Sequence, residues 1–128
     1  MSYFNYKEER RSRNRAIAGV IIIALIVVTV FIGYPVARIC NSNTYTVTIT
    51  DKGYSGSVDD YIVWAEDANG VQYEFINEDE FWYGKFNSGT VQGALKVGHT
   101  YKFSTVGWRI PFLSEYPNII GYELVQAP

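Results

Sequence analysis

The sequence contains a single cysteine and a single histidine, Cys40 and His99, among its 128 residues. One cysteine cannot form an intramolecular disulfide, and one histidine cannot complete the Cys/His ligand sets of structural zinc sites. The chain also lacks a glycine-rich phosphate loop and a stretch with the ligand spacing of a calcium loop. These absences argue against metal-dependent and nucleotide-dependent enzymes, and we expect neither a metal nor another cofactor.

Groups that could act together in catalysis are scarce as well. Cys40 and His99 lie far apart in the sequence, so a Cys–His pair would require the chain near Cys40 to fold back across the rest. Neighbouring carboxylates such as those of residues 59 and 60 point to opposite faces of a strand. We therefore expect no catalytic activity. Cys40 has three open interpretations: no role, a disulfide between two copies, or lipid acylation beside a membrane.

Charge is distributed unevenly along the chain. Five basic residues stand before residue 16, whereas the segment after residue 43 has eleven acidic and five basic residues. Residues 16–37 carry no charge and consist mostly of Ile, Val, Leu and Ala. At about 1.5 Å per residue, residues 16–34 span roughly 28 Å, close to the hydrocarbon thickness of a bilayer. Residues 16–37 are therefore predicted to form a transmembrane helix whose partner is the lipid bilayer.

The basic residues also predict an orientation. Because only Arg38 closely follows the apolar segment, the positive-inside rule places residues 1–15 in the cytoplasm and the rest outside. A cleaved signal peptide or a lipoprotein junction at Cys40 is the alternative, but the apolar stretch is long and Arg38 and Ile39 fit neither cleavage site. We expect an uncleaved, single-pass anchor in the cell membrane.

A polar linker at residues 38–43 leads into alternating apolar and polar residues, the pattern of half-buried strands. Strands are predicted at residues 44–50, 61–66, 71–76, 93–97, 101–106 and 119–125. Residues 51–60 read as a loop, Asn69-Gly70 as a tight hairpin, and Gly98-His99 as a second turn. The pattern predicts an exported all-β domain at residues 44–128. We expect a small barrel of five to six strands, either oligonucleotide/oligosaccharide-binding (OB)-like or a meander, with a two-layer sandwich as the alternative.

Two sequence motifs stand out in this domain. Residues 107–118 read GWRIPFLSEYPN, and an Asn-Glu-Asp element at residues 77–79 is followed by Lys-Phe-Asn-Ser at residues 85–88. With these motifs the chain resembles the uncharacterised, membrane-anchored domain-of-unknown-function proteins of bacteria and phages that end in GWRIPFLS-x-x-PN. The resemblance covers most of the chain from Ile17 onward. It implies an anchor followed by one domain, and it implies no activity.

The candidate binding residues are aromatic or basic: Phe81, Trp82, Tyr83, Phe86, Trp108 and Arg109. Three consecutive aromatics in a strand cannot all face one core, so at least one of residues 81–83 should be exposed to a partner or the membrane interface. Trp108 and Arg109 have two open interpretations, a recognition surface or a packed plug that closes one end of the barrel. The acidic residues 78–80 offer oxygen ligands for a cation such as calcium, or form a solvated turn.

The sequence favours a membrane-anchored extracytoplasmic interaction module without catalytic activity, whose partner is another membrane or envelope protein. The acidic domain argues against nucleic acid as a partner. The resemblance to phage-encoded proteins suggests one alternative, a superinfection-exclusion protein acting at the host membrane. A protein or enzyme that acts on an envelope polymer is the other.

Overall fold

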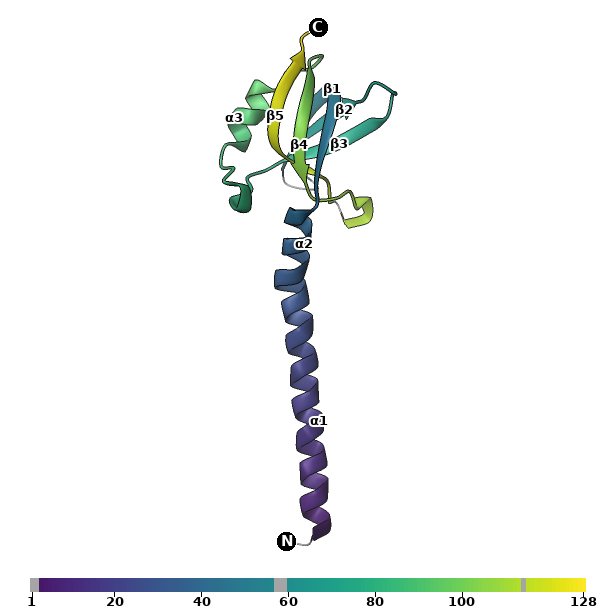
Figure 1. Cartoon of the computed structure of the whole chain (residues 1–128), viewed down its shortest axis with the longest axis vertical. Helices are drawn as coiled ribbons and strands as arrows, with labels where there is room; N and C mark the ends of the chain where they lie inside the picture. Colours follow the sequence, from purple (N-terminus) through teal and green to yellow (C-terminus); the bar gives the residue numbers. More distant parts are fainter. Residues whose placement is uncertain (1–2, 57–59, 114) are drawn as a thin grey trace. The chain divides into compact units, whose positions relative to one another are not determined.

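The computed structural model describes residues 3–56, 60–113 and 115–128 (Figure 1). The chain divides into two compact units, Met1–Ala37 and Arg38–Pro128. The first is helical, and the second is built around one closed sheet. Part of the loop expected at residues 51–60 falls on residues 57–59, which lie outside the described residues.

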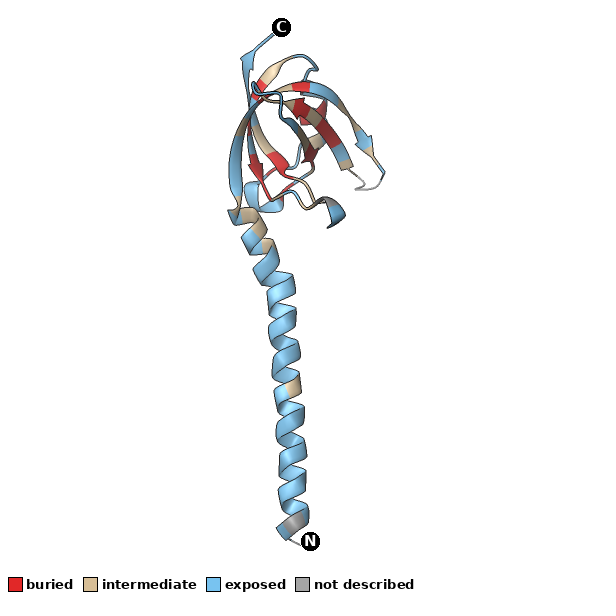
Figure 2. Ribbon diagram, turned by 90° about the vertical axis from the view of Figure 1, so that its right-hand side faces the viewer, coloured by how far each residue is buried: buried red, intermediate tan, exposed pale blue. Residues whose placement is uncertain are grey.

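The helical unit begins with α1 (Tyr3–Val28), which passes through a short π-helix, η1 (Thr29–Gly33), into α2 (Tyr34–Cys40). In η1 the N–H of Tyr34 donates to the carbonyl of Thr29, five residues earlier. The wider turn lies just before Pro35, whose ring would press against the carbonyl four residues back in a regular helix. The side chains of this unit are exposed almost throughout (Figure 2), and the helix is long and apolar enough to cross a membrane.

The linker predicted at residues 38–43 is not present as such. Residues 38–40 belong to α2, and β1 begins at Ser42, so only Asn41 separates helix from strand. The N–H of Asn41 donates to the carbonyl of Arg38 at 3.2 Å, and the N–H of Gly107 donates to the carbonyl of Asn41 at 2.9 Å. Arg38 to Asn41 are thus part of the folded domain, because their backbone and side chains bond to it.

Five strands form the sheet: β1 (Ser42–Ser55), β2 (Asp60–Glu66), β3 (Gln72–Asn77), β4 (Thr100–Val106) and β5 (Asn118–Gln126). The hydrogen-bonded order is β1-β2-β3-β5-β4, and β4 pairs with β1, so the sheet closes on itself. All pairs are antiparallel except β3 with β5, which pair in parallel at Ile76 and Asn118. All strands of the described residues belong to this one closed sheet, so the two-layer sandwich is wrong.

The long strand β1 makes this closure possible. Its first half, to Thr48, pairs with β4, and its second half, to Ser55, pairs with β2. The register shifts between Ile49 and Asp51, where one extra residue bends the strand between its two partners. The loop predicted at residues 51–60 therefore begins later than the sequence predicts, after Ser55. Phe75 and Phe103 fill the interior edge to face, with ring centroids 5.4 Å apart and no exposure.

The strand predicted at residues 93–97 is wrong, because residues 88–94 form a helix, α3 (Ser88–Ala94). Val91 and Leu95, four residues apart, are both buried against the core, which is helical rather than strand spacing. The ammonium of Lys52 donates to the carbonyls of Gln92 and Leu95 at 2.6 and 2.7 Å and so satisfies the end of the helix. With α3 and two 3-10 turns, the domain is not strictly all-β.

Candidate functional site

Arg38 opens the second unit and is surrounded by three carboxylates. Its guanidinium lies 2.9 Å from Glu80, 3.2 Å from Glu78 and 4.0 Å from Glu115. Gly107 lies beside the Arg38 side chain and has a φ of 93°, a backbone conformation in which any other residue would be strained. The first residue of the domain therefore holds together the acidic residues 78–80 and the motif that begins at Gly107.

A second polar cluster lies behind this one, in the interior. Lys85 is buried, and its ammonium donates to the Oδ1 of Asn77 at 2.7 Å and to the carbonyl of Ile119. The amide of Asn77 donates to the Oε1 of Gln92 at 3.0 Å, and Gln92 donates in turn to the carbonyl of Ile62. Because each partner is itself buried or part of the backbone, this cluster is a satisfied internal network.

Asn118 adds further contacts to the first cluster, at Glu78 and Glu80. Its Oδ1 accepts from the N–H of Glu78 at 3.0 Å, its amide donates to the Glu78 carbonyl at 3.2 Å, and the amide also lies 3.5 Å from Glu80. Asn77 and Lys85 belong to one of the two motifs noted above, and Asn118 belongs to the other. Lys85 bonds to Asn77, and Asn118 bonds to Glu78 and Glu80, so these contacts connect β3, the loop after it and β5.

Burial shifts the protonation of this network. Burial lowers the pKa of Lys85 to about 8, and the nearby carboxylates, Asp79 foremost, counteract this only in part. Burial raises the pKa of Glu78 to about 7, assisted by the hydrogen bond and charge of Asp60 and opposed by Arg38. Perturbed groups often mark functional sites, but here the Lys85 ammonium bonds to Asn77 and Ile119, and Glu78 pairs with Arg38.

The acidic residues considered as a cation site are occupied by protein contacts. Glu78 and Glu80 pair with Arg38, and Asp79 accepts a hydrogen bond from the N–H of Ser88 at 3.1 Å, which lowers its pKa. Among the described residues, no group of three His, Cys, Asp or Glu side chains is arranged to hold a metal ion.

The aromatic candidates Phe81, Trp82 and Tyr83 form a 3-10 turn, η2 (Phe81–Tyr83), rather than a strand. All three are exposed, Phe81 to 73%, and Phe86 is exposed beside them. The Phe81 ring contacts Trp82 and Phe86, with centroids 5.8 and 6.3 Å apart. The structure therefore brings these four residues into one apolar patch, whereas the strand-based expectation required only one to be exposed.

Trp108 and Arg109 lie elsewhere, on a groove of about 350 Å³. Trp108 is half-buried, and Arg109 is exposed with its guanidinium 5.9 Å from the centre of the Tyr116 ring. The groove is lined by aromatic, amide and charged side chains together with backbone of β1, β3 and the β4–β5 connection: Asn41, Asn43, Tyr45, Val71, Gln72, Tyr73, Glu74, Phe75, Gly107, Trp108, Arg109 and Pro117. The plug expected from residues 107–118 is only partly realised, because Phe112 and Leu113 of the same segment are exposed.

The tight hairpin predicted at Asn69-Gly70 supports one side of this groove. Gly70 has a φ of 81°, and the Oδ1 of Asp67 accepts from the N–H groups of Asn69 and Val71 at 2.9 and 3.0 Å. The other carboxylate oxygen of Asp67 accepts from the Tyr73 hydroxyl at 3.2 Å. Asp67 thus fixes the turn and the side chain of Tyr73, whose ring contacts Tyr45 in the groove.

Cys40 and His99 occupy different parts of the domain. Cys40 ends α2 and is exposed, whereas His99 precedes β4 and packs its ring against Tyr101, with centroids 6.3 Å apart. The two residues therefore belong to different segments, and His99 is half-buried.

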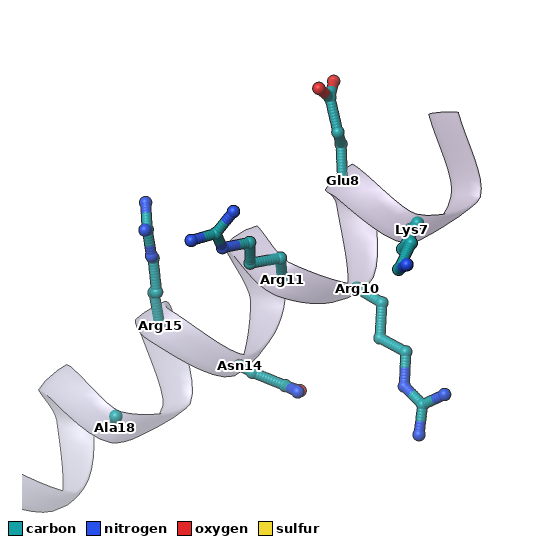
Figure 3. A pocket seen from close by; sticks show the side chains of 7 residues that line it. All are labelled: Lys7, Glu8, Arg10, Arg11, Asn14, Arg15 and Ala18. Atoms are coloured by element: carbon teal, nitrogen blue, oxygen red, sulfur yellow. The ribbon is translucent and has the colours of Figure 1, made fainter. Parts of the chain in front are cut away.

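The basic residues of the first unit are spread around its helix. In Figure 3, Arg10 and Arg15 leave α1 on opposite sides, and Arg11 and Lys7 point in further directions. The hollow among these side chains is lined only by residues 7–18 of one helix. A single helix cannot enclose a ligand, so we interpret these residues as charges at the end of the apolar segment.

Arg38, Lys85, Gln92 and Asn118 were not among the residues selected from the sequence. The available signal was weak: Arg38 is the only charge close after the apolar segment, and Lys85 and Asn118 stand in the two motifs. Comparisons with family models, with curated proteins and with solved structures gave no match for this chain.

Proposed function

We propose that this protein is a membrane-anchored extracytoplasmic interaction module without catalytic activity. Residues 16–37 cross the membrane, residues 1–15 remain in the cytoplasm, and the closed-sheet domain lies outside. The helix that is long and apolar enough to span a bilayer supports the anchor. The excess of basic residues before it supports the orientation.

The domain is proposed to be a barrel of the OB type. Three features support this assignment: the order β1-β2-β3-β5-β4, the parallel contact of β3 with β5, and the position of α3 between β3 and β4. Barrels of this type bind ligands on the face of strands 2 and 3 and at the loops between strands 1–2 and 4–5. The groove lies beside β3 and the β4–β5 connection.

This groove is the observation that carries the proposal. It brings Trp108 and Arg109 together with Tyr45 and Tyr73, and Trp, Tyr and Arg contribute most to interface affinity. Asn41, Asn43 and Gln72 supply amide donors and acceptors along its walls. An extended segment of another membrane or envelope protein fits this combination of flat rings and amides. The acidic domain disfavours nucleic acid.

Site-specific photo-crosslinking in cells tests the proposal. A photoreactive residue at Gln72, inside the groove, should capture one defined protein, and the same residue at Lys96 should not. Lys96 is exposed and absent from the described lining of the groove. Equal capture at both positions, or none at Gln72, would remove the groove as a partner site.

The aromatic and amide lining also favours a second candidate, an envelope polymer bearing sugar rings, because such rings stack on Trp and Tyr. In the same experiment a polymer would appear as a heterogeneous, high-mass adduct at Gln72 that is removed by glycan-degrading enzymes. A discrete adduct removed by protease supports the protein partner.

A further inference from the structure

Two loops of the domain share one construction. In the first, Glu80 and Lys85 pair as an antiparallel bridge around η2, and in the second Ile110 and Glu115 pair around η3 (Pro111–Leu113). Equivalent backbone bonds close both, at 2.9 and 3.0 Å in the first loop and 2.8 and 3.1 Å in the second. Each loop is therefore a short, closed turn whose tip is held away from the core.

The tips of both loops are apolar and uncovered. The first carries Phe81, Trp82 and Tyr83, with Phe86 just behind, and the second carries Phe112 and Leu113. Phe112 is 86% exposed. Large exposed apolar patches are rare on soluble proteins and mark contacts with another protein, a ligand or a membrane. Figure 1 shows both turns at the end of the sheet domain away from the C-terminus.

Both loops contact the residues that follow the apolar segment: Arg38 contacts both, and Ile39 contacts the first. The guanidinium of Arg38 contacts Glu80 at the base of the first loop and Glu115 at the base of the second, at 2.9 and 4.0 Å. The hydroxyl of Tyr83 donates to the carbonyl of Ile39 at 2.6 Å. Arg38 directly follows the uncharged segment at residues 16–37.

The contacts of both loops with Arg38 indicate which surface covers their apolar tips. If residues 16–37 span the bilayer, Arg38 lies at its surface, and the headgroup layer there is only about 5 to 8 Å thick. Loops whose bases touch Arg38 and Ile39 then start within that layer. Trp and Tyr are enriched at the boundary between headgroups and acyl chains, and Phe and Leu bury there in helices that lie on a membrane.

We propose that the tips of the two loops, Phe81–Tyr83 with Phe86 and Phe112 with Leu113, insert into the headgroup boundary of the membrane that the helix crosses. The domain is thereby seated on the bilayer at three points, the helix and two loops. The proposal rests on the membrane-spanning role of residues 16–37 proposed above and is independent of the groove and its partner.

Fluorescence quenching of the full chain in vesicles tests this seating. The probe is the signal of Trp82, taken as the difference between the parent and Trp82→Phe, in phosphatidylcholine/phosphatidylglycerol vesicles with bromines close to the headgroup or near the acyl-chain ends. We expect shallow bromines to remove about half of the Trp82 signal and deep bromines much less, since interfacial aromatics lie at headgroup depth.

A matched pair of probes extends the test in the Trp82→Phe background. Phe112→Trp reports on the second loop and should be quenched like Trp82. Val97→Trp replaces another exposed apolar residue, next to Gly98, which lies against Pro128 at the C-terminal end of the domain. Val97→Trp should be unaffected by bromine at either depth.

Flotation of the same vesicles distinguishes a failure of the loop insertion from a failure of the membrane anchor. If the chain floats with the vesicles but Trp82 and the Phe112→Trp probe are quenched no more than the Val97→Trp probe, the loops are free of the bilayer and the seating is wrong. If the chain does not float with the vesicles, the anchor itself is wrong, and the seating falls with it.

Discussion

The guanidinium of Arg38 lies 2.9 Å from the carboxylate of Glu80, and these side chains are only 14% and 10% exposed. One residue belongs to the last turn of the helix that carries the apolar segment, and the other to the loop after β3. Burying both charges costs several kcal/mol per ion, which their close contact and the added Asn118 and Glu78 contacts offset. The pair therefore holds Arg38, the first residue of the second unit, against the loop after β3.

Removing Arg38 should destabilise the domain. Arg38→Met leaves Glu80 and Glu78 without their cation, and breaking a buried pair in this way costs roughly 3 kcal/mol. Chemical denaturation of the full chain in detergent, followed by tryptophan fluorescence, measures the loss. Arg109→Met is the matched control, because Arg109 is exposed and should change the free energy of unfolding by less than about 0.5 kcal/mol.

Lys85 should be required for the stability of the domain, although burial of its charge is unfavourable. Lys85→Met leaves the Oδ1 of Asn77 and the carbonyl of Ile119 without this donor, at about 1 to 3 kcal/mol per buried group. The exposed Lys96, changed to Met, provides the control. A Lys85→Met chain as stable as the Lys96→Met chain would show that the Lys85 ammonium is not needed.

The raised pKa of Glu78 predicts a dependence of stability on pH. Below its ordinary pKa of 4.5, Glu78 is protonated in both states, whereas between 4.5 and about 7 only the folded state retains the proton. Stability should therefore fall as the pH rises through this window. Glu78→Gln stays neutral and should show a smaller fall in melting temperature between about pH 5 and pH 7. Parallel curves for the two chains would contradict the assignment.

The groove predicts different roles for neighbouring residues of one motif. Trp108 is half-buried, so Trp108→Ala should cost less than the 3 to 5 kcal/mol typical of a fully buried aromatic, roughly 1 to 2 kcal/mol. The same change should abolish crosslinking from Gln72. Phe112→Ala, at an exposed residue absent from the described lining of the groove, should leave that crosslinking intact.

Much of the fold could be predicted from local patterns. Val47 and Ile49 alternate with threonines, and both are buried in the core of the domain, on the strand that the alternation predicts. Asn69-Gly70 forms the expected tight hairpin because its glycine adopts a positive φ. The helix α3 was missed because Gly89 and Gly93 weaken its helical propensity, and its stability depends on burial of Val91 and Leu95 in the core.

The site was harder to predict because it depends on contacts between distant residues. Arg38 pairs with Glu80, 42 residues later, and no local pattern reveals such a partner. The motif residues Asn77, Lys85 and Asn118 stand out in the sequence, but the sequence does not indicate that Lys85 bonds to Asn77 or that Asn118 bonds to Glu78. The aromatic run at residues 81–83 was expected in a strand, whereas Gly84, with a φ of 64°, ends a 3-10 turn that exposes all three rings.

The lone cysteine provides the most direct test of the central claim, an uncleaved anchor with the domain outside the cell membrane. Cys40 is exposed at the end of α2, and Ser12 lies in the basic tail, so the parent is compared with a Ser12→Cys, Cys40→Ser chain. A membrane-impermeant maleimide is added to intact bacterial spheroplasts that express either chain. The account predicts that the parent is labelled at full-length mass, and that the variant is labelled only after the membrane is permeabilised. Labelling of the variant but not of the parent in intact spheroplasts would contradict it.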